Sequence, residues 1–257
     1  MLKKIIELVH DTKGIIIGKQ KEYNVSLKGK KDYVTSVDLA VSKFLHRELK
    51  QLYPEYEFMD EEFNNKVTEF SRPTWILDPI DGTTNLVHEY NLSTVSLALL
   101  EDGNPILGVV YNPFTEETFS AAKGKGAFLN GQQIKVSDVN NIENALVLLG
   151  SNPYERSNPQ QVSKMFKMFE NLFMKVLEIR LLGSAALELC YIACGRSDVY
   201  FEHNLKPWDV AAGIVILKEA GGITTNLDNV EIQPISNQDI VATNGKIHNE
   251  ILNVLNS

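Results

Sequence analysis

The stretch WILDPIDGTTNLVH, residues Trp75–His88, decides how the rest of the chain is interpreted. It opens with an apolar run that predicts a buried strand ending at Asp78. Pro79 stiffens the turn before Asp81, so both carboxylates can point to one side, where a hard divalent cation would neutralise their repulsion. Gly82 lets backbone approach a ligand, and a helix beginning there would direct free N–H groups at phosphate oxygens.

Two other interpretations of this stretch are possible. Asp-Gly-Thr-Thr-Asn is also an ordinary turn with helix-capping residues, but that reading leaves the carboxylate of Asp78 unexplained at the end of an apolar strand. Phosphatases with a covalent aspartyl nucleophile also carry two aspartates after a strand. Their spacing is Asp-x-Asp, whereas here the interval is 81 − 78 = 3 with a proline between, which favours two metal ligands.

Bulk composition limits the possible classes of protein. A chain of 257 residues with 44% hydrophobic residues can form one large domain or two packed halves. A net charge of −8 argues against a sequence-independent grip on nucleic acid. Cys190 and Cys194 lie four residues apart among small apolar neighbours, which predicts buried thiols on one helix face and not a redox or zinc pair.

The N-terminal segment predicts a helix and no signal peptide. Leu2, Ile5, Ile6 and Val9 follow helical spacing, and charged residues interrupt them. No uncharged apolar run approaches the roughly 20 residues of a membrane span. We therefore expect a soluble, cytoplasmic protein without a membrane partner.

The two halves of the chain differ in pattern. Before residue 145, helices are expected over 2–9 and 38–52, and strands over 74–78, 93–101, 105–113 and 117–122, with Asp-Gly-Asn at 102–104 as a hairpin turn. This half predicts two helices against an antiparallel sheet. After residue 145, strands and helices alternate. We expect two packed subdomains, 1–144 and 145–257, which share one site.

Three segments together resemble the inositol monophosphatase family. They are WILDPIDGTTN, the upstream MDEEF and the downstream KPWDVAAG, and the match spans nearly the whole chain. The resemblance implies a mixed α+β and α/β fold in αβαβα layers, as in sugar phosphatases. It also implies a lithium-sensitive, magnesium-dependent hydrolase of phosphate monoesters.

The resemblance assigns the metal ligands residue by residue. Glu61, Asp78 and the backbone carbonyl of Ile80 are implied to bind one Mg²⁺, and Asp78, Asp81 and Asp209 a second. Glu61 would also bind a third, weaker ion, and Mn²⁺ could replace Mg²⁺. Two such cations can activate water and stabilise the leaving oxygen of an in-line displacement.

The same resemblance implies the catalytic and phosphate-binding groups. Thr83 and Asp38 would orient the attacking water, Glu62 would support the metal ligands, and the amides of Gly82 and Thr83 would receive the phosphate. From the residues alone, Asp38 is an ordinary helix N-cap and Asp209 the capped start of another helix. Both roles can coexist, because a capping acid can also face a metal.

The substrate's alcohol is implied to contact a second group of residues. The backbone of Gly183, Ser184 and Ala185 and the carboxylate of Glu202 would reach its hydroxyls, beside Asp81 and Asp209. The alternative for 183–185 is a strand-to-helix turn with a helix cap.

Two departures from the family pattern concern the substrate more than the reaction. Asp60 stands where relatives often have glycine before the acidic pair, and the basic loop around Lys28–Lys31 is one residue short. A small phosphorylated substrate is expected, first an inositol monophosphate. Alternatives are the 2′-phosphate of NADP, fructose 1,6-bisphosphate or a 3′-phosphorylated nucleotide, and, from another class, a regulatory or scaffold protein. A homodimer is implied by resemblance.

Overall fold

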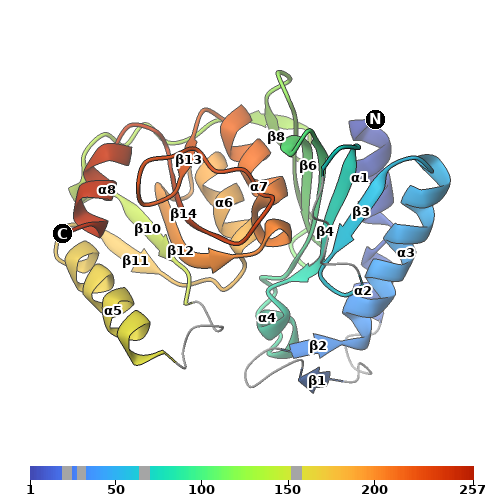
Figure 1. Ribbon diagram of the computed structural model, residues 1–257, viewed down its shortest axis with the longest axis horizontal. Coiled ribbons are helices and arrows are strands. Elements are labelled where there is room, and N and C mark those ends of the chain that lie inside the picture. Colours follow the sequence, from blue (N-terminus) through green and yellow to red (C-terminus); the bar gives the residue numbers. More distant parts are fainter. Residues whose placement is uncertain (19–24, 28–32, 64–69, 152–157) are drawn as a thin grey trace.

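Five layers of helix and sheet make up the computed structural model of the chain, which describes residues 1–18, 25–27, 33–63, 70–151 and 158–257. In Figure 1 they follow one another across the molecule as helix, sheet, helix, sheet and helix. This arrangement confirms the layered fold expected from the sequence. The basic residues Lys28, Lys30 and Lys31 lie outside the described residues.

A seven-stranded sheet forms one of the two β layers, in the order β3-β4-β5-β6-β7-β8-β9. Its strands are β3 (Glu57–Asp60), β4 (Thr74–Asp81), β5 (Thr94–Glu101), β6 (Asn104–Asn112), β7 (Glu117–Ala122), β8 (Ala127–Leu129) and β9 (Gln132–Ile134). The sheet is antiparallel except that β3 runs parallel to β4. The expected all-antiparallel sheet is therefore wrong at this edge, because the link between β3 and β4 is long enough for a crossover.

The second β layer is a five-stranded sheet with the order β11-β10-β12-β14-β13. Its strands are β10 (Leu146–Leu149), β11 (Glu178–Arg180), β12 (Val199–Leu205), β13 (Ile223–Thr225) and β14 (Gln238–Thr243). β10 pairs in parallel with both β11 and β12, whereas β14 pairs antiparallel with both β12 and β13. A separate pair, β1 (Val25–Leu27) and β2 (Tyr33–Thr35), lies apart from both sheets.

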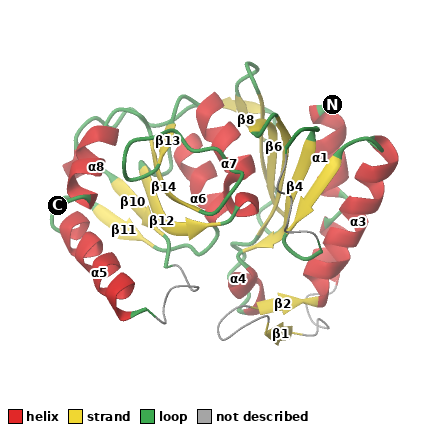
Figure 2. Cartoon of the chain, in the orientation of Figure 1, coloured by secondary structure: helices red, strands yellow, loops and turns green. Residues whose placement is uncertain are grey.

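Helices occupy the remaining three layers (Figure 2). They are α1 (Leu2–His10), α2 (Lys13–Gly18), α3 (Ser36–Leu52), α4 (Thr83–Val87), α5 (Pro159–Phe173), α6 (Ala185–Ala193), α7 (Pro207–Glu219) and α8 (His248–Leu255), with a 3₁₀ turn at Ile142–Asn144. α1 and α3 cover the outer face of the larger sheet, α6 and α7 fill the space between the sheets, and α5 and α8 cover the smaller sheet. Among the described residues, none of the helices has the length and apolar character needed to traverse a membrane.

Alternation along the strands explains the continuous apolar runs. In β4, Trp75 and Leu77 belong to the core under α1 and α3, whereas Ile76 belongs to the central core around α6 and α7. Successive side chains point to opposite faces of a sheet, so a strand covered on both faces is apolar at every position. By the same alternation Asp78 follows Ile76 on the face toward α7.

β4 continues further than the sequence indicated. The predicted strand ends at Asp78, but the structure extends it to Asp81 with a shift of register against β5 between these two aspartates. The residues Pro79 and Ile80 form this irregularity, because proline cannot donate to the ladder. The turn at Asp102 and Gly103 between β5 and β6 is confirmed, and both residues have the positive φ that such a two-residue turn requires.

The two halves of the chain share their largest core. Ile76 and Val110 from the first sheet pack with Leu189 of α6 and Ile216 of α7 in one cluster. A division of the chain at residue 144 stays a prediction. The two cysteines are only partly as expected, since Cys190 is buried within α6 but Cys194 follows its last turn and is half-buried.

Close approach of α7 to β6 depends on a missing side chain at Gly108. A Cβ at this position would lie 2.6 Å from the carbonyl oxygen of Ala212 and 2.6 Å from Cγ1 of Val215. Backbone must move to relieve a contact of that kind, and α7 carries Asp209 in its first turn.

Replacement Gly108→Ala is expected to destabilise the protein by about 1–3 kcal/mol, because overpacking forces α7 away from the sheet. The midpoint of urea unfolding measures the loss. Gly14→Ala is the matched control, since Gly14 lies in α2 and a Cβ there meets nothing within 4 Å. Equal midpoints for the two variants would contradict the close packing of α7.

Candidate active site

Asp78 and Asp81 are both buried at the end of β4. Asp78 Oδ1 accepts a hydrogen bond of 3.0 Å from the amide of Ile80. Asp81 Oδ2 accepts from the hydroxyl of Ser184 and, at 2.9 Å, from the amide of Ala186 in the first turn of α6. The two carboxylates therefore accept hydrogen bonds from different parts of the chain.

Asp38 and Asp209 each occupy the third position of a helix. Asp38 Oδ2 accepts from the amide of Thr35 at 3.0 Å, and the hydroxyl of Thr35 also bonds to it. Asp209 Oδ2 accepts from the amide of Lys206 at 2.8 Å. The expectation that Asp38 is the N-cap is wrong by three residues, because Thr35 caps α3 and Asp38 returns the bond as in a capping box.

Thr83 joins the helix start of α3 to the aspartate motif. Its hydroxyl lies 3.3 Å from Asp38 Oδ1 and 3.0 Å from the carbonyl oxygen of Ile80. Asp38 therefore uses one oxygen for its own helix and presents the other to Thr83. The carbonyl of Ile80, an implied metal ligand, is a partner of the same hydroxyl.

Glu61 and Glu62 lie in the turn that follows β3. The amide of Glu61 donates to the carbonyl of Leu77 at 3.3 Å, which continues the parallel pairing of β3 with β4. This bond holds the backbone of Glu61 beside the residue that precedes Asp78. The amide of Glu62 donates to Asp60 Oδ1 at 2.6 Å.

The start of α4 packs tightly against the start of α6. Gly82 is the N-cap of α4 with φ 82°, and a Cβ there would lie 3.0 Å from the carbonyl oxygen of Gly183 and 3.2 Å from Cβ of Ser184. Asn85 Nδ2 donates to the carbonyls of Leu182 at 2.7 Å and Gly183 at 3.3 Å. The implied phosphate-binding and substrate-binding backbones thus adjoin each other.

Ser184 has a different environment from the one expected. It is the N-cap of α6, but its side chain makes no capping hydrogen bond and instead donates to Asp81. The alternative of a strand-to-helix turn with a helix cap at residues 183–185 is confirmed in position, although the Ser184 hydroxyl itself does not cap the helix. Asp81 itself accepts from the α6 amide that an N-cap side chain ordinarily serves.

Glu202 lies on β12 against the backbone of β10. A Cβ added at Gly150 would overlap its carboxyl group, and Tyr200 donates a hydrogen bond of 2.5 Å to Glu202 Oε2. Glu188 is fully buried near this pair, where its Oε1 accepts from the amide of Leu182 and its Oε2 has no hydrogen-bond partner.

Electrostatics show that the acids act on one another. Burial raises the pKa of Asp78 well above its usual value of 3.8, and the charges of Glu61, Asp81, Asp209 and Asp38 raise it further. Burial also raises the pKa of Asp209 and outweighs the hydrogen bond from the amide of Lys206, which lowers it. Asp81 reaches a pKa of about 6 because burial outweighs its hydrogen bonds from Ser184 and the α6 amides. A cation nearby would remove this electrostatic cost.

The donor set suits magnesium in its chemistry. Carboxylate and carbonyl oxygens are the ligands that this hard cation prefers. Within the described part of the chain, no three acidic, histidine or cysteine side chains already converge as a closed metal cage. The protein donors of Asp78, Asp81 and Asp209 account for part of this, since each takes one oxygen of its carboxylate.

The family model for the inositol monophosphatase family matches residues 2–257. The chain belongs to the inositol monophosphatase family. It is a phosphatase of this family, and inositol monophosphatase 3 of Solanum lycopersicum is 39% identical to it over 243 residues, which cover 93% of this chain and 90% of that protein.

Solved structures of the family have the same fold. An inositol monophosphatase (IMPase) of Thermotoga maritima aligns with a TM-score of 0.89 at 35% identity, covering 99% of this chain and 96% of that one. A family structure described as an IMPase/NADP phosphatase complexed with Mg²⁺ and phosphate aligns with a TM-score of 0.87 at 27% identity, covering 99% and 94%. Members of the inositol monophosphatase family therefore bind Mg²⁺.

Several residues that organise this family site were not identified from the sequence. The sequence pattern assigns no role to Asn85, to the hydroxyl of Ser184 or to the buried Glu188. The Asp60 position was noted only as a departure. Asp60 and Asn85 are polar residues beside the motif acids, which was the available signal, whereas the partner of Ser184 is 103 residues away in the chain.

Stability of the metal-free protein should fall as pH rises through the pKa of Asp81. This pKa is raised from 3.8 to about 6, so the folded state keeps a proton that the unfolded state has lost, and that stability is present below about pH 4 and lost by about pH 7. In a chelating buffer, the decrease in Tm between pH 5 and pH 7 should be several degrees smaller for Asp81→Asn than for the wild type. Parallel Tm curves for the two proteins would refute this.

Proposed function

We propose that this phosphatase hydrolyses phosphate monoesters of small polyols, with inositol monophosphates first among them, and that it requires Mg²⁺. One observation carries the proposal. Asp78 lies buried near the end of β4, where burial raises its pKa and the charges of carboxylates from separate elements, Glu61 after β3, Asp209 in α7 and Asp38 in α3, raise it further. A protein gains nothing from concentrating like charges in this way unless a cation is bound there.

Glu61, Asp78, Asp81, Asp209 and the carbonyl of Ile80 would hold two magnesium ions, and Glu61 a third, weaker one. When bound, such ions activate water and stabilise the leaving oxygen of the phosphoryl group. Manganese has the same preference for oxygen ligands and is proposed as a substitute.

Thr83 and Asp38 would orient the attacking water. The single proton of the Thr83 hydroxyl has two acceptors, the carbonyl oxygen of Ile80 at 3.0 Å and Asp38 Oδ1 at 3.3 Å, so its lone pairs remain to accept a proton of that water. A water held in this way turns its own lone pair toward the phosphorus. Glu62 would support Glu61 from the adjacent position in the turn.

The water and the leaving alcohol would lie on opposite sides of the phosphorus, as an in-line displacement requires. The amides of Gly82 and Thr83 begin α4 and would donate to phosphate oxygens. The backbone of Gly183, Ser184 and Ala185 and the carboxylates of Glu202, Asp81 and Asp209 would receive the hydroxyls of the alcohol. The bond between Tyr200 and Glu202 supports a fixed orientation of that carboxylate.

We also propose that the phosphatase is a homodimer and is inhibited by lithium, both from family membership. Exposed apolar side chains on α5 and around β11 support a contact between copies. They are Phe166, Phe173, Met174, Leu177 and Leu181. Sedimentation velocity measures the mass in solution. The cytoplasmic location expected from the sequence stays a prediction.

A panel of substrates tests the reaction and its specificity. Inositol 1-phosphate, NADP, fructose 1,6-bisphosphate and a 3′-phosphorylated nucleotide are compared by kcat/KM of phosphate release. We expect inositol 1-phosphate to rank first, with turnover in Mg²⁺ and none in excess chelator. A higher kcat/KM for NADP would move the specificity toward the family structure described as an IMPase/NADP phosphatase, and absence of turnover with every ester would contradict the proposal.

Asp81→Asn should reduce kcat more than about 100-fold at any Mg²⁺ concentration, because it removes a proposed ligand charge, and effects above that size exceed those of residues that only support ligands. The initial rate of phosphate release measures this. Asp102→Asn is the control, since Asp102 is exposed in a turn with a positive φ that asparagine adopts readily. Full activity of Asp81→Asn would contradict the metal assignment. If the variant loses activity but keeps any partner binding, catalysis and a scaffold role are separate.

A further inference from the structure

Asp60 is a buried carboxylate that the proposed mechanism does not use. It ends β3 next to Glu61 and is only 1% exposed. A carboxylate in such a position is costly unless it is hydrogen-bonded on all sides. Its partners therefore indicate what it does.

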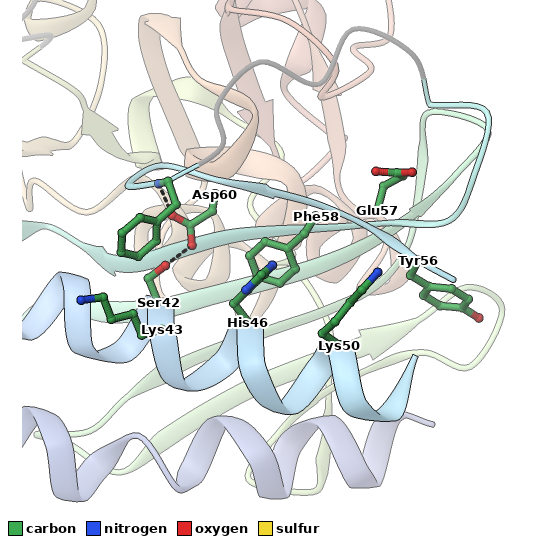
Figure 3. A pocket seen from close by; sticks show the side chains of 9 residues that line it. Ser42, Lys43, His46, Lys50, Tyr56, Glu57, Phe58 and Asp60 are labelled. Carbon is green, nitrogen blue, oxygen red and sulfur yellow. Dashed lines mark hydrogen bonds between the residues drawn. The ribbon is translucent and has the colours of Figure 1, made fainter. Parts of the chain in front are cut away.

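The carboxylate of Asp60 connects the acidic turn to α3. Oδ1 accepts from the amide of Glu62 at 2.6 Å and from the amide of Phe63 at 3.0 Å. Oδ2 accepts from the hydroxyl of Ser42, which is itself buried on α3 (Figure 3). One oxygen thus closes the turn that contains Glu61, and the other ties that turn to a helix.

β3 fixes the other side of the same turn. Asp60 pairs with Leu77 on the parallel strand β4, and the amide of Glu61 donates to the carbonyl of Leu77. The backbone of Glu61 is therefore held on one side by its own hydrogen bond to β4 and on the other by the bonds that the next two amides donate to Asp60. The charge of Glu61 is felt at Asp78, which follows Leu77.

We infer that Asp60 is a positioning residue, which orients the turn so that the Glu61 carboxylate faces Asp78 and thereby sets the affinity of the site for Mg²⁺. The inference rests on the proposed metal-dependent function. Charge-assisted bonds from backbone amides restrict a turn more strongly than neutral ones, and carboxylates that support metal ligands commonly affect affinity about 10–100-fold.

Asp60 and Ser42 can be substituted without leaving a sealed cavity, because both lie beside an open pocket. Both residues line a pocket of about 410 Å³ between α3 and β3, whose other walls include His46 and Phe58 (Figure 3). Removing the Ser42 hydroxyl therefore leaves no sealed void. Asp60→Asn keeps the shape of the side chain, removes its charge and replaces one acceptor oxygen by an NH₂ donor, which the rotatable Ser42 hydroxyl can accept.

Calorimetric titration of the substrate-free protein with Mg²⁺ tests the inference directly. We expect Asp60→Asn to raise the Kd for Mg²⁺ about tenfold or more and Ser42→Ala to raise it by a smaller factor. At saturating Mg²⁺ the kcat of both variants should stay within about threefold of the wild type, because the turn can still be ordered by the metal.

Asp198→Asn is the matched control. Asp198 is also buried and accepts from a serine hydroxyl, that of Ser137, and from a backbone amide, that of Leu146 at 2.8 Å, but it lies among neither the proposed ligands nor their neighbours. It should lower Tm as Asp60→Asn does and leave the Kd for Mg²⁺ unchanged. If Asp60→Asn acted only through a general loss of stability, the Kd for Mg²⁺ would be unchanged in both variants.

A double-mutant cycle with Glu61→Gln decides whether Asp60 acts through Glu61. In the Glu61→Gln background, Asp60→Asn should have no further effect on Kd, whereas independent contributions would add. If the wild type binds Mg²⁺ and the Kd is unchanged in both Asp60→Asn and Ser42→Ala, the positioning role of Asp60 is refuted and the proposed function is not affected. A wild type that neither binds Mg²⁺ nor hydrolyses an ester overturns the proposed function and this inference with it.

Discussion

Burial of several carboxylates around Asp78, together with the repulsion between them, is the constraint on which the rest of this structure depends. Three of the acids offset it in the same way, because each accepts an amide hydrogen bond at the start of a helix. Asp38 takes the amide before α3, Asp209 the amide before α7, and Asp81 an amide of α6. The positive end of each helix dipole stabilises the charge. These bonds do not cancel the cost of burial, since the pKa of Asp81 still rises to about 6.

The layered fold is what brings three helix starts to one place. α6 and α7 lie between the sheets, and α7 approaches the larger sheet closely because Gly108 has no side chain. Where α4 meets α6, Gly82 lies against Gly183 and Ser184 in the same manner. The positions of the acids therefore depend on the packing of the central core. A substitution far from the acids can move them by moving a helix.

A carboxylate with two oxygens can serve folding and chemistry together. Asp38 completes the capping box of α3 with Oδ2 and presents Oδ1 to Thr83. Asp60 uses its two oxygens similarly, one for the turn and one for Ser42. Helix capping and the role proposed for Asp38 are therefore compatible, because they use different atoms of one side chain.

The sequence by itself determined the local elements and the class of chemistry. The apolar run before Asp78, the turn at Asp102 and Gly103 and the alternation after residue 145 predicted strands, hairpin and helices, since these follow from periodicity and turn residues within a few positions. The motif acids predicted a metal and phosphate site for the same local reason. Only the tertiary structure decided that Ser184 bonds to Asp81, that β3 lies parallel to β4 and that Asp60 reaches Ser42. These contacts join residues far apart in the chain, and no local pattern encodes which distant donor a buried carboxylate will meet.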